Sequence, residues 1–398
     1  MGNVSYRSTM RACWISSATQ SLMVVYVPLL FLHFQKEFGI TLSQLGILIV
    51  MNFGTQFMMD LFAAHYAERI GIRLCLVMSN AMVVAGFLGL VILPSLMPPF
   101  AGLCISSVLY GVGGGLVEVI VSPLVEACPS DNKVASMAFL HSLYGLGCIV
   151  IILASTLFFT LFGLERWRWL TLIWLLVPLY NMFNYMRVPL PPSMSGGQAG
   201  LTVGQLIRMP IFWLMIGLMM LGGSIEVAMA QWSSAFTEGT LGVSKSVGDL
   251  FGACFFATLL FVSRTLYGRL TIRFDLNSIM LGSSLIGIAG FVMVAFSPWA
   301  WLSMLGLGLS GLSVGVVWPG TLSLSAQRIP NGGTAMFGLC ALGGDVGCTL
   351  GPAIMGWIAA AFDGNLRAGM CAGLGYATLL FLGLLLLKKV GRRKRYGL

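Results

Sequence analysis

Charged residues are scarce in this 398-residue chain, where Asp, Glu, Lys and Arg together make up 9%. Soluble domains hold roughly a quarter of such residues, so the composition excludes an ordinary soluble enzyme or binding domain. A metal or redox pattern is also lacking, because the nine cysteines, from Cys13 to Cys371, stand singly and form no C-x-x-C pair. We therefore expect these cysteines to be packing residues in an apolar interior.

Apolar sequence fills the chain instead and accounts for 58% of its residues. Twelve apolar stretches are each long enough to cross a hydrocarbon layer of about 30 Å as a helix. The first stretch holds Arg11, Gln20 and Pro28 and no small-residue cleavage site, which indicates a retained helix rather than a secretion signal. The predicted fold class is an all-α membrane protein with twelve transmembrane helices. The predicted spans are 10–34, 43–66, 74–93, 99–125, 134–162, 169–187, 211–236, 248–268, 276–296, 299–326, 333–361 and 368–387.

The second six stretches repeat features of the first six. Segment 59–69, at the end of the second stretch, aligns with segment 263–273, at the end of the eighth. Gly115 and the proline that follows it in the fourth stretch align with Gly311 and its proline in the tenth. Two pseudo-symmetric six-helix bundles that move about a site held between them are typical of secondary transporters.

One segment interrupts the apolar pattern between the two sets of six. It holds Pro189, Pro191, Pro192 and the pair Gly196-Gly197, so we interpret residues 188–209 as a cytoplasmic linker. The predicted domains are an N-terminal bundle of residues 1–187 and a C-terminal bundle of residues 210–398 that ends in a basic tail.

The net charge of +9 could suggest a nucleic-acid partner, but the placement of the basic residues explains it better. With the N-terminus inside, 17 of the 22 Lys and Arg residues fall in cytoplasmic segments, including the tail 388–395. The positive-inside rule then predicts a plasma (inner) membrane protein with both termini in the cytoplasm. The tail can contact anionic lipid headgroups. The expected partners are the lipid bilayer and a small-molecule solute, with no nucleic acid, and we expect a monomer.

Segment 64–73, A-H-Y-A-E-R-I-G-I-R, resembles the signature loop of the major facilitator superfamily. Other segments resemble the branch of fucose, glucose and galactose sugar:proton symporters: the spacing from Glu118 to Pro123, and 141–147, 225–228 and 318–324. The resemblance implies transport by alternating access between two bundles. It also implies gating roles for the loop residues Glu68, Arg69, Gly71 and Arg73, and for Gly268 in the repeat of the loop.

Four of the thirteen acids, Asp60, Glu118, Glu226 and Asp345, lie inside predicted spans, while the others, Asp249 among them, lie in loops or at span ends. A carboxylate at the bilayer centre costs on the order of 3 kcal/mol, so we expect each of these four acids to have a specific role. We expect no Lys or Arg at the depth of Glu118, Glu226 or Asp345, and we predict that at least one of them carries a proton. A protonated structural carboxyl is one alternative. A sodium site is another and would need several further oxygen ligands; no cofactor other than the coupling ion is expected.

Glu118 and His141 form the strongest candidate pair for proton transfer. Glu118 lies about eight residues from the end of its predicted span and His141 about seven from the start of the next, so both are ~11 Å deep on antiparallel helices. A carboxyl and an imidazole at one depth can pass a proton between them. The alternative for His141 is a hydrogen-bonded packing residue.

Asp60 and Arg264 occupy equivalent places in the two repeats, near the predicted cytoplasmic ends of the second and eighth spans. Opposite charges at equivalent ends predict a cytoplasmic latch that holds one conformation and breaks in the other. The alternative is that each side chain reaches the membrane surface independently.

The predicted solute site combines neutral hydrogen-bonding groups with flat aromatic faces. Such a combination favours a neutral polyhydroxylated solute such as a sugar, and the expected absence of intramembrane Lys or Arg disfavours anions. Packing or a place at the membrane interface is the alternative for each Trp. The predicted site residues are Gln20, Asn52, Gln56, Tyr144, Glu226, Gln231, Trp232 and Trp318.

No catalytic constellation is found. The matches to G-x-S-x-G at 311–315 and to G-x-G-x-x-G at 306–311 fall within one predicted span, with no preceding strand, and indicate close helix packing. The sequence therefore predicts a transporter rather than an enzyme, most simply a proton-coupled symporter of a neutral sugar. The alternatives are a proton-coupled antiporter that exports apolar or cationic compounds, which the 24 methionines would suit, and a transporter-like sensor or lipid-moving protein.

Overall fold

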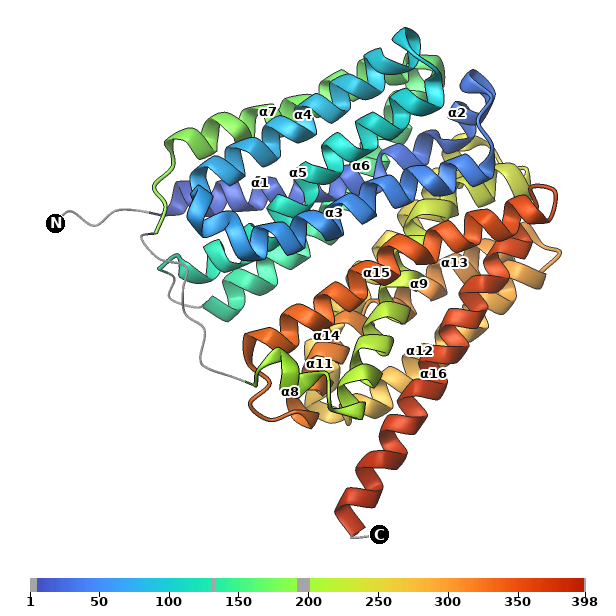
Figure 1. Ribbon diagram of the computed structural model, residues 1–398. Coiled ribbons are helices and arrows are strands. Elements are labelled where there is room, and N and C mark those ends of the chain that lie inside the picture. Colours follow the sequence, from blue (N-terminus) through green and yellow to red (C-terminus); the bar gives the residue numbers. More distant parts are fainter. Residues whose placement is uncertain (1–5, 130–132, 192–200, 397–398) are drawn as a thin grey trace. The chain divides into compact units, whose positions relative to one another are not determined.

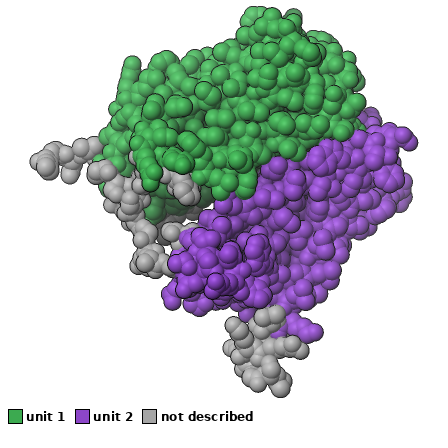
Figure 2. Space-filling view, viewed as in Figure 1, with its two compact units in different colours: residues 1–195 green, residues 196–398 purple. Residues whose placement is uncertain are grey.

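The computed structural model describes residues 6–129, 133–191 and 201–396. Every regular element within these residues is a helix (Figure 1). The chain forms two compact units, unit 1 (Met1–Ser195) and unit 2 (Gly196–Leu398), coloured separately in Figure 2.

Unit 1 contains six long helical segments. The first is interrupted by a 3₁₀ turn, η1 (Val27–Leu30), where Pro28 supplies no backbone N–H to the preceding turn. Its elements are α1 (Arg7–Val25), η1, α2 (Phe31–Phe38), α3 (Leu42–Ile70), α4 (Ile72–Leu96), α5 (Pro99–Ala127), α6 (Lys133–Phe162), η2 (Leu164–Arg166) and α7 (Trp167–Arg187).

Unit 2 repeats this plan after one short helix. Its elements are α8 (Val203–Leu206), α9 (Pro210–Leu241), α10 (Lys245–Gly248), the π-helical turn η3 (Asp249–Cys254), α11 (Phe255–Arg273), α12 (Leu276–Phe296), α13 (Ala300–Val314), α14 (Val317–Arg328), α15 (Gly333–Ala361) and α16 (Leu366–Tyr396). The tenth span is thus divided into α13 and α14 at Gly315 and Val316.

The helices confirm the predicted twelve-helix membrane fold. Among the described residues, eleven helical segments are long and apolar enough to cross a membrane by length and composition alone. The one predicted span outside this set is the sixth (169–187), which corresponds to α7, a helix that is 21 residues long but less apolar, since it contains Asn181 and Asn184. Several helices extend beyond their predicted ends: α3 continues to Ile70 and α11 to Arg273, because amphipathic turns follow the apolar stretches.

The division between the units falls within segment 188–209, and the predicted domain limits stay a prediction. Residues 192–200 lie outside the described residues. Further along this segment, Thr202 caps α8 by accepting a hydrogen bond from the Gln205 N–H, so the segment contains a helical turn that the sequence analysis did not predict.

Glycines allow close helix packing inside each unit. In unit 1, a Cβ at Gly115 of α5 would lie 2.6 Å from the Gln56 carbonyl oxygen of α3. In unit 2, a Cβ at Gly351 of α15 would lie 2.5 Å from Cα of Ser224 in α9. At both contacts the backbones approach too closely for any side chain larger than hydrogen, as is common where membrane helices pack.

Candidate functional site

Four of the predicted site residues form one hydrogen-bonded chain in unit 1. The Gln20 amide of α1 donates from Nε2 to Oε2 of Glu118 on α5 at 3.2 Å and to Oε1 of Gln56 on α3 at 2.9 Å. Gln56 donates in turn to Oδ1 of Asn52, one helical turn away, at 2.9 Å. Three helices therefore contribute to a continuous line of polar groups that begins at an exposed carboxylate and ends at a buried amide.

The glycine face of α5 positions this chain. Gly111, Gly114 and Gly115 precede Glu118 by seven, four and three residues, so they share the face of α5 that carries it. A Cβ at Gly114 would lie 2.8 Å from Cδ of Gln56, so the amide of Gln56 occupies the space that a side chain would take. The absence of three side chains on α5 is what admits the polar side chains of α3.

Gln20 has hydrogen-bonding capacity left over. Its Oε1 is buried, and among the described residues it has no hydrogen-bond partner. Buried acceptors in folded proteins are nearly always satisfied, by protein, water or ligand. This oxygen is therefore a place where a hydroxyl group could donate.

α6 lies beside α1 at the level of Gln20. The Ser17 hydroxyl donates to the Leu140 carbonyl oxygen at 3.0 Å, and the Ser21 hydroxyl donates to that of Tyr144 at 2.7 Å. His141 is exposed and Tyr144 is partly buried. Since Gln20 contacts Glu118, these bonds place His141 and Glu118 at a similar level of unit 1. Proton transfer between them stays a prediction.

Glu226 in unit 2 has an arginine partner, which corrects the expectation that no Lys or Arg lies at its depth. Nη2 of Arg264 on α11 lies 2.9 Å from Oε2 and 3.1 Å from Oε1 of Glu226 on α9. Arg264 lies nine residues before the end of α11, about 14 Å along the helix. The expectation of no intramembrane arginine, which disfavoured anionic solutes, is therefore wrong. The carboxylate of Glu226 nevertheless offsets the positive charge of Arg264.

Arg264 also satisfies a carbonyl group that the helix break leaves open. Pro319 cannot donate a backbone N–H to the Gly315 carbonyl oxygen, four residues earlier. Nε of Arg264 donates to that oxygen at 3.4 Å. One guanidinium thus links α9, α11 and the junction of α13 with α14.

The aromatic residues of the predicted solute site are largely committed to packing. Trp232 is 1% exposed, and its indole N–H donates to the Pro352 carbonyl oxygen at 2.8 Å. The expectation that Trp232 presents an open face to a solute is therefore not met in this structure. Trp318 is partly buried, and its ring packs on α15, where Cη2 lies 2.5 Å from the position of a Cβ at Gly344.

Two further predicted residues lie near these aromatic rings in the chain. Gln231 is buried in α9, next to Trp232. Asp345 is partly buried in α15 and directly follows the glycine beneath Trp318. The proton-carrying role of Asp345 and the solute-binding role of Gln231 stay predictions.

The predicted gating residues separate into three groups. Asp60 is 6% exposed on α3, and its latch with Arg264 stays a prediction, since the two residues belong to different units. Arg73 donates to the carbonyl oxygens of Tyr185 and Val188 at 2.6 and 2.9 Å, where it closes the end of α7.

The remaining gating residues are described in part. Gly71 joins α3 to α4 at φ +103°, a conformation that favours glycine. Arg69 is exposed near the end of α3. Glu68 lies in α3 and Gly268 in α11, and the structure describes only the backbone at these two positions.

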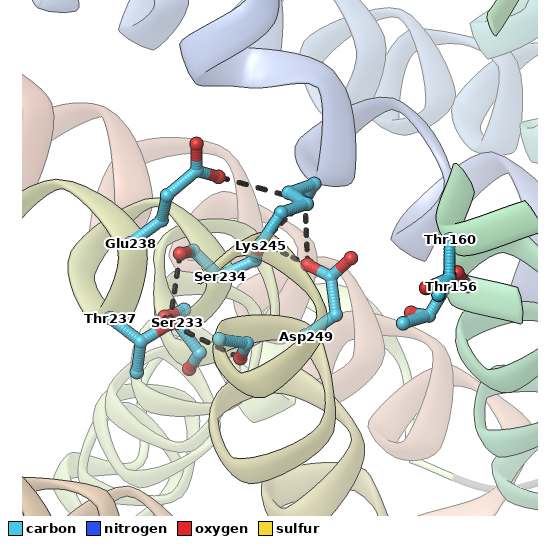
Figure 3. A network of polar contacts seen from close by, with 9 residues as sticks. Thr156, Thr160, Ser233, Ser234, Thr237, Glu238, Lys245 and Asp249 are labelled. Atoms are coloured by element: carbon cyan, nitrogen blue, oxygen red, sulfur yellow. Dashed lines mark hydrogen bonds and ion pairs between the residues drawn. The ribbon is translucent and has the colours of Figure 1, made fainter. Parts of the chain in front are cut away.

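Unit 2 contains a buried charge cluster that was not predicted from the sequence. Asp249 was expected in a loop or at a span end, yet it is fully buried at the start of η3. Nζ of Lys245 lies 2.6 Å from Oδ1 of Asp249, which also accepts from the Ser234 hydroxyl at 2.5 Å, and Nζ lies 4.0 Å from Glu238 (Figure 3). The spacing of four between Lys245 and Asp249 was the available signal.

Comparison with known proteins agrees with this architecture. The model of the family described as "Major Facilitator Superfamily" matches residues 12–264, which is more than half of the chain. The chain is 25% identical over 354 residues to "Membrane protein MosC" of Rhizobium meliloti. The alignment covers 88% of this chain and 81% of that protein.

Two solved structures have the same fold. A bacterial homolog of the human lysosomal transporter Spinster, inward-facing and occupied, aligns with a TM-score of 0.76 at 15% identity and covers 98% of both chains. A D-xylose-proton symporter aligns with a TM-score of 0.76 at 12% identity and covers 95% of this chain and 98% of that one. The chain thus belongs to the major facilitator superfamily, and it is an integral membrane transporter rather than an enzyme.

Proposed function

We propose that the chain is a proton-coupled symporter that moves a neutral, hydroxyl-bearing solute of the sugar class by alternating access. The observation that carries this proposal is the bridge made by Gln20, whose amide contacts both Glu118 and the buried Gln56. Amide side chains both donate and accept hydrogen bonds, which suits a solute with many hydroxyl groups. The amide of Gln20 contacts the carboxylate of Glu118, which can take up a proton.

The bridge gives protonation a direct effect on the solute-binding groups. A charged Glu118 only accepts hydrogen bonds, and it holds the Nε2 end of the Gln20 amide. A protonated Glu118 also donates, so the amide of Gln20 has reason to turn. Turning that amide changes which of its atoms faces Gln56 and which faces a solute hydroxyl. Proton binding and solute binding are then coupled through a single side chain.

The charges of unit 2 are consistent with a neutral solute. Arg264 is the counter-ion of Glu226, and Lys245 is the counter-ion of Asp249. Neither pair needs a charged solute for compensation. One protein of the same fold is described as a D-xylose-proton symporter, which is in line with this class of solute.

Uptake into proteoliposomes tests the proposal. A panel of radiolabelled D-xylose, L-fucose and D-glucose is compared with D-glucuronate and with a lipophilic cation, tetraphenylphosphonium, with and without an inward proton gradient. We expect one or more neutral sugars to accumulate only with the gradient. The Gln20→Ala variant should lose most of this uptake and still fold, because Gln20 is only partly buried.

The same panel separates the alternatives. Gradient-driven expulsion of tetraphenylphosphonium with no sugar uptake would support the antiporter and contradict the proposal. Accumulation of glucuronate without any neutral sugar would contradict the neutral class. Ser8→Ala, at an exposed position near the start of α1, is the matched control for Gln20→Ala and should transport normally.

A further inference from the structure

Unit 2 has an apolar groove between α11 and α12, two helices that both pack on α13. Its volume is about 360 Å³, within the ~300–1,000 Å³ of ligand pockets. Leu266 and Leu270 of α11 form one wall and Ile279 and Ile286 of α12 the other. Both α11 and α12 pack on α13, so the groove between them has a floor that includes Leu312.

The length of the groove matches one leaflet of a bilayer. On α11 it extends from Ser263 to the level of Phe274, just beyond the end of the helix. Eleven residues of helix rise span about 16 Å. The hydrocarbon core of a bilayer is ~30 Å thick, so one leaflet contributes about half of that. An extended chain lying in this groove would run parallel to the helices through one leaflet.

Two of the three serines that line the groove form hydrogen bonds within the protein. The Ser283 hydroxyl donates to the Ser313 carbonyl oxygen, and the Ser278 hydroxyl donates to Asp275 at 3.3 Å. Leu266, Leu270 and Phe274 keep about 41, 38 and 60% of their surfaces exposed. The groove therefore offers apolar contact and few hydrogen-bonding groups. A sugar would need such groups, whereas an acyl chain would not.

The end of α11 adds positive charge to one mouth of the groove. Arg273 follows Leu266 and Leu270 at helical spacings of seven and three, so it lies on the wall face one turn beyond the apolar residues. Arg269 lies one turn before Arg273, and both are exposed. The nearby Asp275 is engaged as the N-cap of α12, where it accepts from the Ser278 N–H at 3.1 Å. Two arginines at the mouth of a membrane groove complement a phosphate group.

We propose that this groove binds an anionic phospholipid, with an acyl chain between α11 and α12 and the phosphate at Arg273 and Arg269. The occupant is a lipid rather than a transported solute, because the groove has the length of a leaflet and its charge lies only at the mouth. The proposal does not depend on the choice of transported solute.

Gly282 provides a way to fill the groove without disturbing the helix. It lines the groove on α12, and a Cβ at this position would have no heavy atom within 4 Å. Leucine in its place fills the open space and favours the helix more than glycine does. Gly375→Leu in α16 is the matched control, since a Cβ there is also unobstructed.

Native mass spectrometry of the purified full chain, supplied with phosphatidylglycerol or phosphatidylcholine of the same chain length, tests the proposal. Gly282→Leu should reduce retention of both lipids. The Arg269→Gln, Arg273→Gln double variant should reduce retention of phosphatidylglycerol by roughly fivefold per arginine and leave phosphatidylcholine unchanged. Arg187→Gln, an exposed arginine at the end of α7, is the charge control.

Several outcomes would overturn the proposal. One is equal retention of phosphatidylglycerol in the wild type, the groove variants and the controls. Another is arginine-dependent binding of inorganic phosphate that is as tight as that of the lipid, since the acyl chain would then contribute nothing. A Gly282→Leu variant that forms fewer dimers while keeping its lipid would assign the groove to a second copy of the chain.

Discussion

The guanidinium of Arg264 lies 2.9 Å from the carboxylate of Glu226, and the same side chain donates to the open carbonyl of Gly315. Breaking this arrangement on one side should leave an uncompensated, partly buried charge. We expect Glu226→Gln or Arg264→Gln to lower the free energy of unfolding by on the order of 2 kcal/mol, less than the ~3–5 of a fully buried pair. Thermal unfolding in detergent measures this, with the Glu226→Gln, Arg264→Gln double variant closing the cycle. A double variant as unstable as the sum of the two single ones would contradict the pairing.

The buried cluster around Asp249 should be a second source of stability in unit 2. Asp249 is fully buried and Lys245 is its counter-ion at 2.6 Å. Lys245→Met leaves a buried carboxylate without its ammonium and should cost about 3–5 kcal/mol. Lys245→Met combined with Asp249→Leu should recover part of the loss. Unchanged thermal unfolding of Lys245→Met would show that the pair contributes nothing.

Trp232 should behave as a core residue. Its indole is 1% exposed and bonded to the Pro352 carbonyl oxygen, so Trp232→Ala should lower the free energy of unfolding by about 3–5 kcal/mol. Trp232→Phe should keep most of the packing while losing one hydrogen bond. Solute affinity and thermal stability are measured together. A stable Trp232→Ala protein with weakened solute binding would restore the role of a binding platform.

The approach of α3 to α5 should be sensitive to a single methyl group. A Cβ at Gly115 would meet the Gln56 carbonyl oxygen at 2.6 Å and Cβ of Met59 at 2.7 Å. Gly115→Ala should therefore separate the helices, cost about 1–3 kcal/mol and weaken solute exchange, because Gln56 moves with α3. Gly217→Ala in α9, where a Cβ has no neighbour within 4 Å, should have no such cost. Equal behaviour of the two variants would contradict the close approach.

The fold could be predicted from the sequence because the bilayer imposes a length and a polarity on every span. The glycine spacing on α5 is likewise readable in the sequence as a face that another helix can approach, and Asn52 and Gln56 of α3 occupy it. Spacing along one helix fixes such a face whatever its neighbours are.

Contacts between distant helices could not be predicted in the same way. The pairing of Glu226 with Arg264 is a contact between α9 and α11, and hydropathy alone does not give which side chains of two helices meet. Asp249 begins a π-helical turn and is fully buried beside Lys245, and hydropathy alone gives neither the turn nor the burial. Trp232 was expected at a solute because a flat aromatic face beside hydrogen-bonding groups suits a sugar, yet its indole N–H donates to Pro352 across the α9–α15 contact.

Gradient-driven uptake beside equilibrium exchange in the Glu118→Gln protein tests the central claim most directly. Glutamine imitates the protonated carboxyl at nearly constant shape and can still contact Gln20. We predict that this variant exchanges a transported sugar across the membrane but no longer accumulates it in response to a proton gradient. Glu165→Gln, an exposed acid in η2, should do both as the wild type does. Full uphill accumulation by the Glu118→Gln protein would contradict the proposed coupling of proton and solute through Gln20.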